Sequence, residues 1–179
     1  MNHDRYDDAY IRDILTRVRT IAVVGASANP SRPSFFVTKY LAERGFEVYP
    51  VNPGQAGREI AGRPAFATLA DVPVAIDMVD VFRAAEHLPA VLDEVLALSP
   101  LPKVLWMQQG VRHDETAARA EATGIEVVMN RCPKIEYGRL SGEIGWTGVN
   151  SRTISSKRPQ RLGSGVQRLS LGPATARDK

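Results

Sequence analysis

The sequence has little of what several protein classes require. Its 179 residues include a single cysteine, which excludes an intramolecular disulfide framework and a zinc site made of cysteines alone. Apolar runs such as Ile21–Val24 are far shorter than the ~20 residues needed to cross a bilayer. The amino-terminal segment is polar and acidic, unlike a secretory signal, and the histidines lack metal-ligand spacing. We therefore expect a cytoplasmic protein with no membrane partner and no metal.

The charge of the chain is unevenly distributed. The formal net charge is +3 and the pI is near 9.2. Residues 1–150 contain 16 Lys and Arg against 19 Asp and Glu, whereas residues 151–179 contain seven against one. We predict a mildly acidic folded domain over 1–150 and a basic tail rich in Ser, Gly and Arg over 151–179. A nucleic-acid partner is disfavoured, because the domain lacks a basic face interleaved with aromatic residues.

Apolar segments typical of strands alternate with segments of helical periodicity along the domain. The predicted strands are 21–25, 47–52, 75–82, 103–108 and 126–130, and the predicted helices are 7–19, 34–44, 88–96 and 114–123. This alternation predicts an α/β fold with a Rossmann-like open parallel sheet of about five strands and helices on both faces. We expect the strand order 3-2-1-4-5.

The loop after the first strand, residues 25–34, is the most informative segment. Ligands of open parallel sheets bind beyond the carboxyl ends of the strands, near the point where the strand order reverses. Gly25 permits a tight exit from the strand, and the loop leads into a helix N-terminus whose free N–H groups favour phosphate. Ser27 and Ser34 add hydroxyl donors, and Arg32 adds a positive charge. The loop therefore predicts a phosphate-binding site.

The same loop departs from the dinucleotide fingerprint G-x-G-x-x-G. Ser27 stands where the second glycine would be, and Asn52 ends the second strand where an acid would bind a ribose diol. An amide cannot accept hydrogen bonds from two hydroxyls as a carboxylate does. An oxidoreductase that uses NAD(P) on the same fold therefore stays an alternative, although a disfavoured one.

Five short segments at successive strand ends carry a family resemblance. They are Val24–Ser27, Tyr49–Pro53, Met78–Arg83, Gln109–Arg112 and Arg131–Lys134. Together they resemble the small bacterial CoA-binding proteins, which are similar to the N-terminal CoA-binding domain of the succinyl-CoA synthetase α chain. The resemblance covers roughly residues 10–150. It implies coenzyme A or an acyl-CoA as the ligand.

The resemblance also implies which positions would contact CoA. These are Gly25, Ala26, Ser27, Asn29, Pro30, Arg32 and Ser34 for the diphosphate, Val51, Asn52, Pro53, Val81, Phe82 and Arg83 for the adenosine, and Gln109 and Gly110 for the pantetheine arm. A lysine often found after the Val-Asn-Pro motif, near the 3′-phosphate, is replaced here by Gly54 and Gln55. Either Arg58 or Arg32 is a candidate to take its role.

The sequence does not contain a coherent set of nucleophile, base and orienting group. We interpret Cys132 as a half-buried apolar residue, although a thiol that forms a mixed disulfide with CoA is the functional alternative. We interpret His113, at the start of a helix, as a helix cap or a solvent-exposed residue, although a general base is the functional alternative. Asp77 and Asp80 should point to opposite faces of their strand, which argues against shared acid–base chemistry.

The leading interpretation is a non-catalytic protein that binds CoA or an acyl-CoA as a sensor or carrier. Enzymatic activity and a homo-oligomeric state stay open. Besides the NAD(P) oxidoreductase, a second alternative to this interpretation is an interaction protein that acts through the basic tail, residues 151–179.

Overall fold

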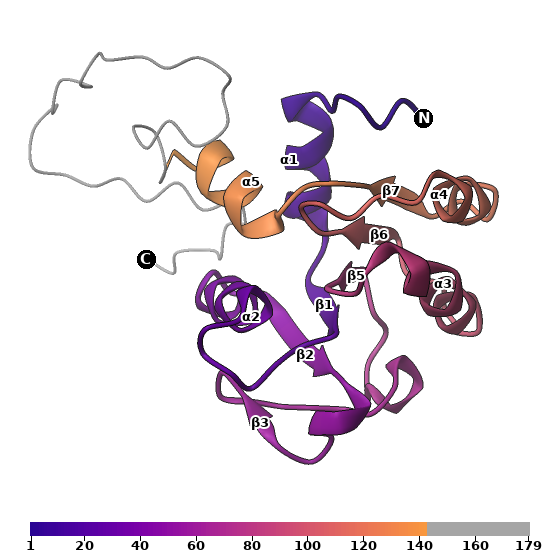
Figure 1. Ribbon diagram of the computed structural model, residues 1–179. Coiled ribbons are helices and arrows are strands. Elements are labelled where there is room, and N and C mark those ends of the chain that lie inside the picture. Colours follow the sequence, from indigo (N-terminus) through magenta and orange to yellow (C-terminus); the bar gives the residue numbers. More distant parts are fainter. Residues whose placement is uncertain (143–179) are drawn as a thin grey trace, which may run out of the picture.

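A five-stranded parallel sheet forms the centre of the computed structural model, which describes residues 1–142 (Figure 1). Its strands are β1 (Thr20–Val24), β2 (Glu47–Val51), β5 (Met78–Val81), β6 (Val104–Met107) and β7 (Glu126–Val128). Each consists largely of apolar residues, as strands covered on both faces require. The sheet matches the predicted fold class and the number of strands.

Helices cover both faces of the sheet, as the sequence predicts (Figure 1). On one face lie α1 (Asp8–Arg17), α2 (Pro33–Glu43) and α5 (Pro133–Leu140), and on the other lie α3 (Leu88–Leu96) and α4 (Asp114–Glu121). Neighbouring residues of a strand contribute to different cores: Ala22 packs toward α3 and α4, whereas Ile21 and Val23 pack toward α1 and α2. This alternation is the two-residue period of β structure.

The predicted strand order is wrong in one respect. The observed order is β2-β1-β5-β6-β7, so the third sheet strand, β5, lies between β1 and β6 instead of outside β2. Pro50 in β2 gives the physical reason, because proline lacks an N–H and is confined to edge strands. Its carbonyl faces the outer edge and accepts a hydrogen bond from the Phe66 N–H at 2.9 Å. The strand order consequently reverses between β1 and β5.

Two elements that sequence periodicity did not reveal complete the fold. A hairpin of β3 (Glu59–Ile60) and β4 (Arg63–Pro64) turns through Ala61 and Gly62, both with positive φ. Helix α5 begins directly after Cys132 and buries Tyr137. Short 3₁₀ turns occur at η1 (Pro53–Gln55), η2 (Leu69–Asp71) and η3 (Ala85–His87).

The predicted division into a domain and a tail stays a prediction, because residues 143–179 lie outside the described part of the chain. In residues 1–142, no helix combines the length and the apolar character needed to cross a membrane.

Candidate functional site

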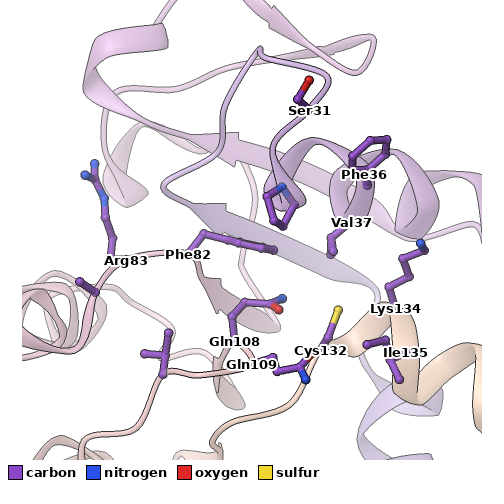
Figure 2. A pocket seen from close by; sticks show the side chains of 13 residues that line it. Ser31, Phe36, Val37, Phe82, Arg83, Gln108, Gln109, Cys132, Lys134 and Ile135 are labelled. Atoms are coloured by element: carbon purple, nitrogen blue, oxygen red, sulfur yellow. The ribbon is translucent and has the colours of Figure 1, made fainter. Parts of the chain in front are cut away.

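A cavity of about 640 Å³ opens at the carboxyl edge of the sheet, above β1, β5 and β6. This is the size of small-molecule sites in proteins, and it lies where the strand order reverses. Figure 2 shows the side chains around it. The lining residues are Ser31, Pro33, Phe36, Val37, Phe82, Arg83, Ala84, Gln108, Gln109, Val111, Cys132, Lys134 and Ile135.

Gly25 lets the first loop leave β1 directly against the end of β5. Its φ is +83°, and a Cβ placed there would lie 2.6 Å from the backbone oxygen of Phe82. No side chain fits at that distance. The aliphatic part of Arg83 also lies against this position, so Gly25 brings the first loop next to Phe82 and Arg83. Glycine is therefore required here by both conformation and space.

The first loop is held by its own hydrogen bonds. The Ser27 hydroxyl accepts from the Asn29 N–H at 3.2 Å, the Asn29 side chain accepts from the Ser31 N–H at 2.9 Å, and the Asn29 carbonyl accepts from the Arg32 N–H at 3.0 Å. These amides are engaged within the loop. The Ser27 hydroxyl retains its own proton for donation, because it acts only as an acceptor in this bond.

Asn52 joins the second loop to the first. Its side-chain Nδ2 donates to the Ala26 carbonyl at 2.7 Å, and its Oδ1 accepts from the Gly54 N–H at 3.0 Å. A carboxylate at this position could not donate to Ala26. The amide that distinguishes this sequence from the dinucleotide fingerprint thus has a structural role, which is to position the glycine-containing loop.

Positively charged side chains lie at and near the cavity. Arg83 and Lys134 line it, and the Lys134 ammonium lies 5.6 Å from the centre of the Tyr40 ring. Within residues 1–142, the guanidinium groups of Arg32 and Arg83 have no carboxylate partner. Unpaired cations beside a glycine-containing loop suit an anionic ligand.

A buried carboxyl group lies beneath the cavity. Asp80 is fully buried, and both of its carboxyl oxygens accept hydrogen bonds from Nε2 of Gln108, at 2.8 and 3.0 Å. Burial raises the pKa of Asp80 to about 8, and the bond from Gln108 offsets part of that rise. Gln108 itself lines the cavity, although only 6% of its surface is exposed.

Cys132 is half-buried, which agrees with its interpretation as an apolar residue, but its sulfur points into the cavity (Figure 2). It precedes α5 and lies on the same face of the sheet as Asp80 and Gln108. Burial raises the pKa of the thiol, so the neutral form dominates at neutral pH. The neutral thiol is a poor nucleophile.

Two other titratable residues have structural partners. His113 Nδ1 accepts from the Thr116 N–H at 3.1 Å and so caps α4. Asp77 lies at the opposite edge of the sheet from the cavity, where it contacts Lys103 Nζ at 2.7 Å. Burial acts to raise the pKa of Asp77, but the hydrogen bonds from Lys103 and two backbone N–H groups lower it further than burial raises it.

The structure brings together only part of the predicted residue set. Phe82, Arg83 and Gln109 line the cavity, and the first loop borders it through Ser31. Other predicted residues are not among those that line the cavity; of these, Ala26, Ser34, Val51 and Val81 are buried, whereas Asn29, Pro30, Arg32, Pro53 and Gly110 are exposed. The set as a ligand-contact list stays a prediction.

Sequence reasoning missed several lining residues. The sequence pattern places Gln108 at the end of the predicted strand 103–108, and Phe36 and Val37 in the predicted helix 34–44. Ile135 follows the last predicted loop and belongs to α5, which was not predicted. One signal in the sequence points to them: Asp80 is a polar residue within an apolar strand, Gln108 directly follows an apolar strand, and both lie on the same face.

Comparison with known proteins identifies the family of this chain. The family model described as "CoA binding domain" matches residues 19–138, and so the chain belongs to that family. It is 38% identical over 129 residues to the uncharacterized protein YneT of Bacillus subtilis, covering 72% of this chain and 93% of that protein. The resemblance drawn from the sequence motifs is therefore confirmed.

A longer relative and two solved structures extend the comparison. The α subunit of an ADP-forming acetate–CoA ligase from Pyrococcus furiosus is 34% identical over 86 residues, which are 46% of this chain and 19% of that subunit. A Thermus thermophilus structure described as cell-free ID.343 matches with 43% identity and a TM-score of 0.71, covering 75% of this chain and 99% of its own. A Pyrococcus horikoshii OT3 protein matches with 36% identity and a TM-score of 0.72, covering 78% and 96%.

Proposed function

We propose that this protein binds coenzyme A or an acyl-CoA across the carboxyl edge of its sheet, as a binding, sensing or carrier protein without turnover. The observation that carries the proposal is the cavity at the β1–β5 reversal point, bordered by the Gly25 loop and by Arg83, which has no carboxylate partner among residues 1–142. Membership in the CoA-binding domain family supports a CoA-binding role for such a cavity.

Two regions of the cavity differ in chemistry and suit two different parts of a ligand. Ser31 in the first loop and Arg83 next to that loop suit a diphosphate. Val37, Val111 and Ile135 give the cavity apolar walls, which suit the alkyl segments of a pantetheine arm. A diphosphate joined to a long, mostly apolar arm is the shape of CoA.

Binding without turnover agrees with the state of the titratable groups. The Cys132 thiol is held in its neutral form, and His113 is engaged as a helix cap. Neither group has the activated form that a nucleophile or general base needs. A nicotinamide cofactor is disfavoured because Asn52 donates to Ala26, so its amide has no capacity to bind a ribose diol as an acid would.

Isothermal titration of the full chain with CoA, dephospho-CoA and NADPH tests the proposal. We expect CoA to bind in the micromolar range or more tightly and NADPH to bind at least tenfold more weakly. Tighter binding of NADPH, or the absence of heat with CoA, would overturn it. The ratio for CoA and dephospho-CoA in Arg32→Ala and Arg58→Ala variants identifies the residue that contacts the 3′-phosphate.

A matched pair of variants tests the position of the diphosphate. Ser31 is exposed in the first loop and lines the cavity, so it tolerates a longer side chain. Ser31→Glu places a carboxylate there and should weaken CoA binding at least tenfold, whereas the isosteric Ser31→Gln should weaken it much less. Equal affinities of the two variants would show that the diphosphate lies elsewhere.

The alternative role through the basic tail requires a separate test. Deletion of residues 151–179 should leave CoA affinity unchanged if the cavity is the functional site. Loss of partner capture with unchanged CoA binding would favour an interaction protein that acts through the tail.

A further inference from the structure

Asp80 is an unusual residue for the middle of this sheet. It lies in β5, between β1 and β6, and all four residues of β5 are buried. A buried carboxyl group destabilises a fold unless it is well hydrogen-bonded, and such groups often have a role in ligand binding. The side-chain amide of Gln108, a residue of the cavity wall, donates hydrogen bonds to Asp80.

The hydrogen bonds determine how the Gln108 amide is oriented. A carboxylate only accepts hydrogen bonds, and a neutral carboxyl group still offers its carbonyl oxygen, so Asp80 attracts the NH₂ end of the amide. The two bonds, at 2.8 and 3.0 Å, hold Nε2 toward Asp80. The carbonyl oxygen Oε1 then lies on the other side of the trigonal amide. Among residues 1–142, no protein group donates a hydrogen bond to Oε1.

The surroundings of Gln108 make this oxygen a rare polar feature of the inner cavity. Figure 2 shows Gln108 between Phe82 and Cys132, and Val37 and Ile135 lie nearby. Only 6% of the surface of Gln108 is exposed, so a ligand atom that contacts its side chain is largely removed from water. In such a setting an unmatched donor or acceptor is costly, and a matched one contributes selectivity.

We propose that Asp80 is a positioning residue that turns Gln108 so that its side-chain carbonyl accepts a hydrogen bond from an amide N–H of the ligand's arm. The ligand class is therefore an apolar chain that carries amide donors. This inference rests on the proposed function, since the pantetheine arm of CoA contains two secondary amides.

The test compares CoA with two synthetic analogues in which one or the other amide N–H is replaced by an ester oxygen. The full-length protein should bind one analogue about tenfold more weakly than CoA, because that analogue lacks the donor and sets an oxygen against Oε1. Adenosine 3′,5′-bisphosphate, which has no arm, serves as the reference ligand for the nucleotide part of the site.

Two variants of the pair keep the fold and remove the oriented carbonyl. Asp80→Asn can form a cyclic amide pair with Gln108, which engages Oε1. Asp80→Leu combined with Gln108→Met replaces both partners by apolar groups of similar shape, a change that is often neutral for stability. In both variants, CoA should bind about tenfold more weakly and the preference for CoA over the ester should disappear. Affinity for the bisphosphate should not change.

Asp77→Asn is the matched control, since it makes the same substitution three residues away at the opposite edge of the sheet. It should retain the discrimination between CoA and the ester. If the wild-type protein binds CoA and both esters equally, or if the variants of the pair still discriminate, the inference is overturned while CoA binding stands. If the wild-type protein binds neither CoA nor the bisphosphate, the proposed function fails as well.

Discussion

The two ends of β5 carry carboxyl groups three residues apart in opposite environments. At the amino edge, Asp77 accepts hydrogen bonds from the Arg19 N–H at 2.8 Å and pairs with Lys103 at 2.7 Å. At the carboxyl edge, Asp80 is fully buried and contacts the Gln108 amide beneath the cavity. The amino edge is arranged for stability. The carboxyl edge contains a destabilising group at the place where a ligand would bind.

The largest expected effect concerns two glycines at opposite edges. Gly25→Ala should lower the free energy of unfolding by about 3–4 kcal/mol, because the Cβ would overlap the Phe82 carbonyl and the φ is positive. Gly45, before β2, also has a positive φ, but nothing lies within 4 Å of its Cβ position, so Gly45→Ala should lower it by only about 1 kcal/mol. Urea unfolding measures both, and equal losses would contradict the close approach at the carboxyl edge.

The pH dependence of stability should separate the two carboxyl groups. The pKa of Asp80 is raised to about 8 in the folded state, against about 4 in the unfolded chain. The folded state then binds the extra proton between these values, so this group's contribution to stability falls as pH rises from about 4 to 8. The pKa of Asp77 is lowered, so the stability that this group adds above its unfolded pKa is lost as pH falls below about 4.

Asp80→Asn should remove the decline between pH 4 and 8, because the asparagine side chain does not titrate. Asp77→Asn should leave that decline unchanged and should reduce the loss of stability that occurs as the pH falls below about 4. Thermal or urea unfolding across the pH range gives both profiles. A decline that persists unchanged in Asp80→Asn would assign it to other groups.

Asn52→Asp tests the link between the first and second loops. The substitution replaces the donor to the Ala26 carbonyl with a carboxylate oxygen, so it should lower the free energy of unfolding by about 2 kcal/mol. It also restores the acid of the dinucleotide fingerprint, yet NADPH affinity should not rise. Calorimetry and NADPH titration check the two outcomes, and a gain of tight NADPH binding would revive the oxidoreductase alternative.

The smallest effect is expected at the ion pair of the amino edge. The Lys103 side chain is 53% exposed, so solvent screens its interaction with Asp77. Lys103→Met should lower the free energy of unfolding by less than about 1 kcal/mol and leave CoA binding unchanged. A larger loss in urea unfolding would show that the amino edge depends on this pair.

Most helices and strands could be predicted from periodicity, because each buries a regular stripe or an unbroken apolar run. The errors have identifiable causes. The strand order failed although Pro50 marked β2 as an edge strand. The β3–β4 hairpin was missed because Ala61 stands where asparagine or glycine usually signals such a turn. Helix α5 was missed because its buried side includes Glu136 and Gly138 as well as Tyr137, which hides the apolar period.

The candidate site was predictable in position but not in composition. Loops at strand ends could be assigned to one edge because parallel strands all end there. The role of Asn52 could not be predicted, since its partner Ala26 is 26 residues away and belongs to another loop. For Ser34 the local pattern suggested a role that the packing does not support. A hydroxyl at a helix start suggests a hydrogen-bond donor to phosphate, but only 3% of the Ser34 surface is exposed.

The sequence by itself determined the alternation of strands and helices, the edge of the sheet where the cavity opens and the family, because these depend on local periodicity and on short motifs. Only the tertiary structure decided that β5 lies beside β1 and that Asp80 holds the Gln108 amide at the cavity wall. Those features depend on contacts between residues far apart in the chain, and local pattern carries no information about such distances.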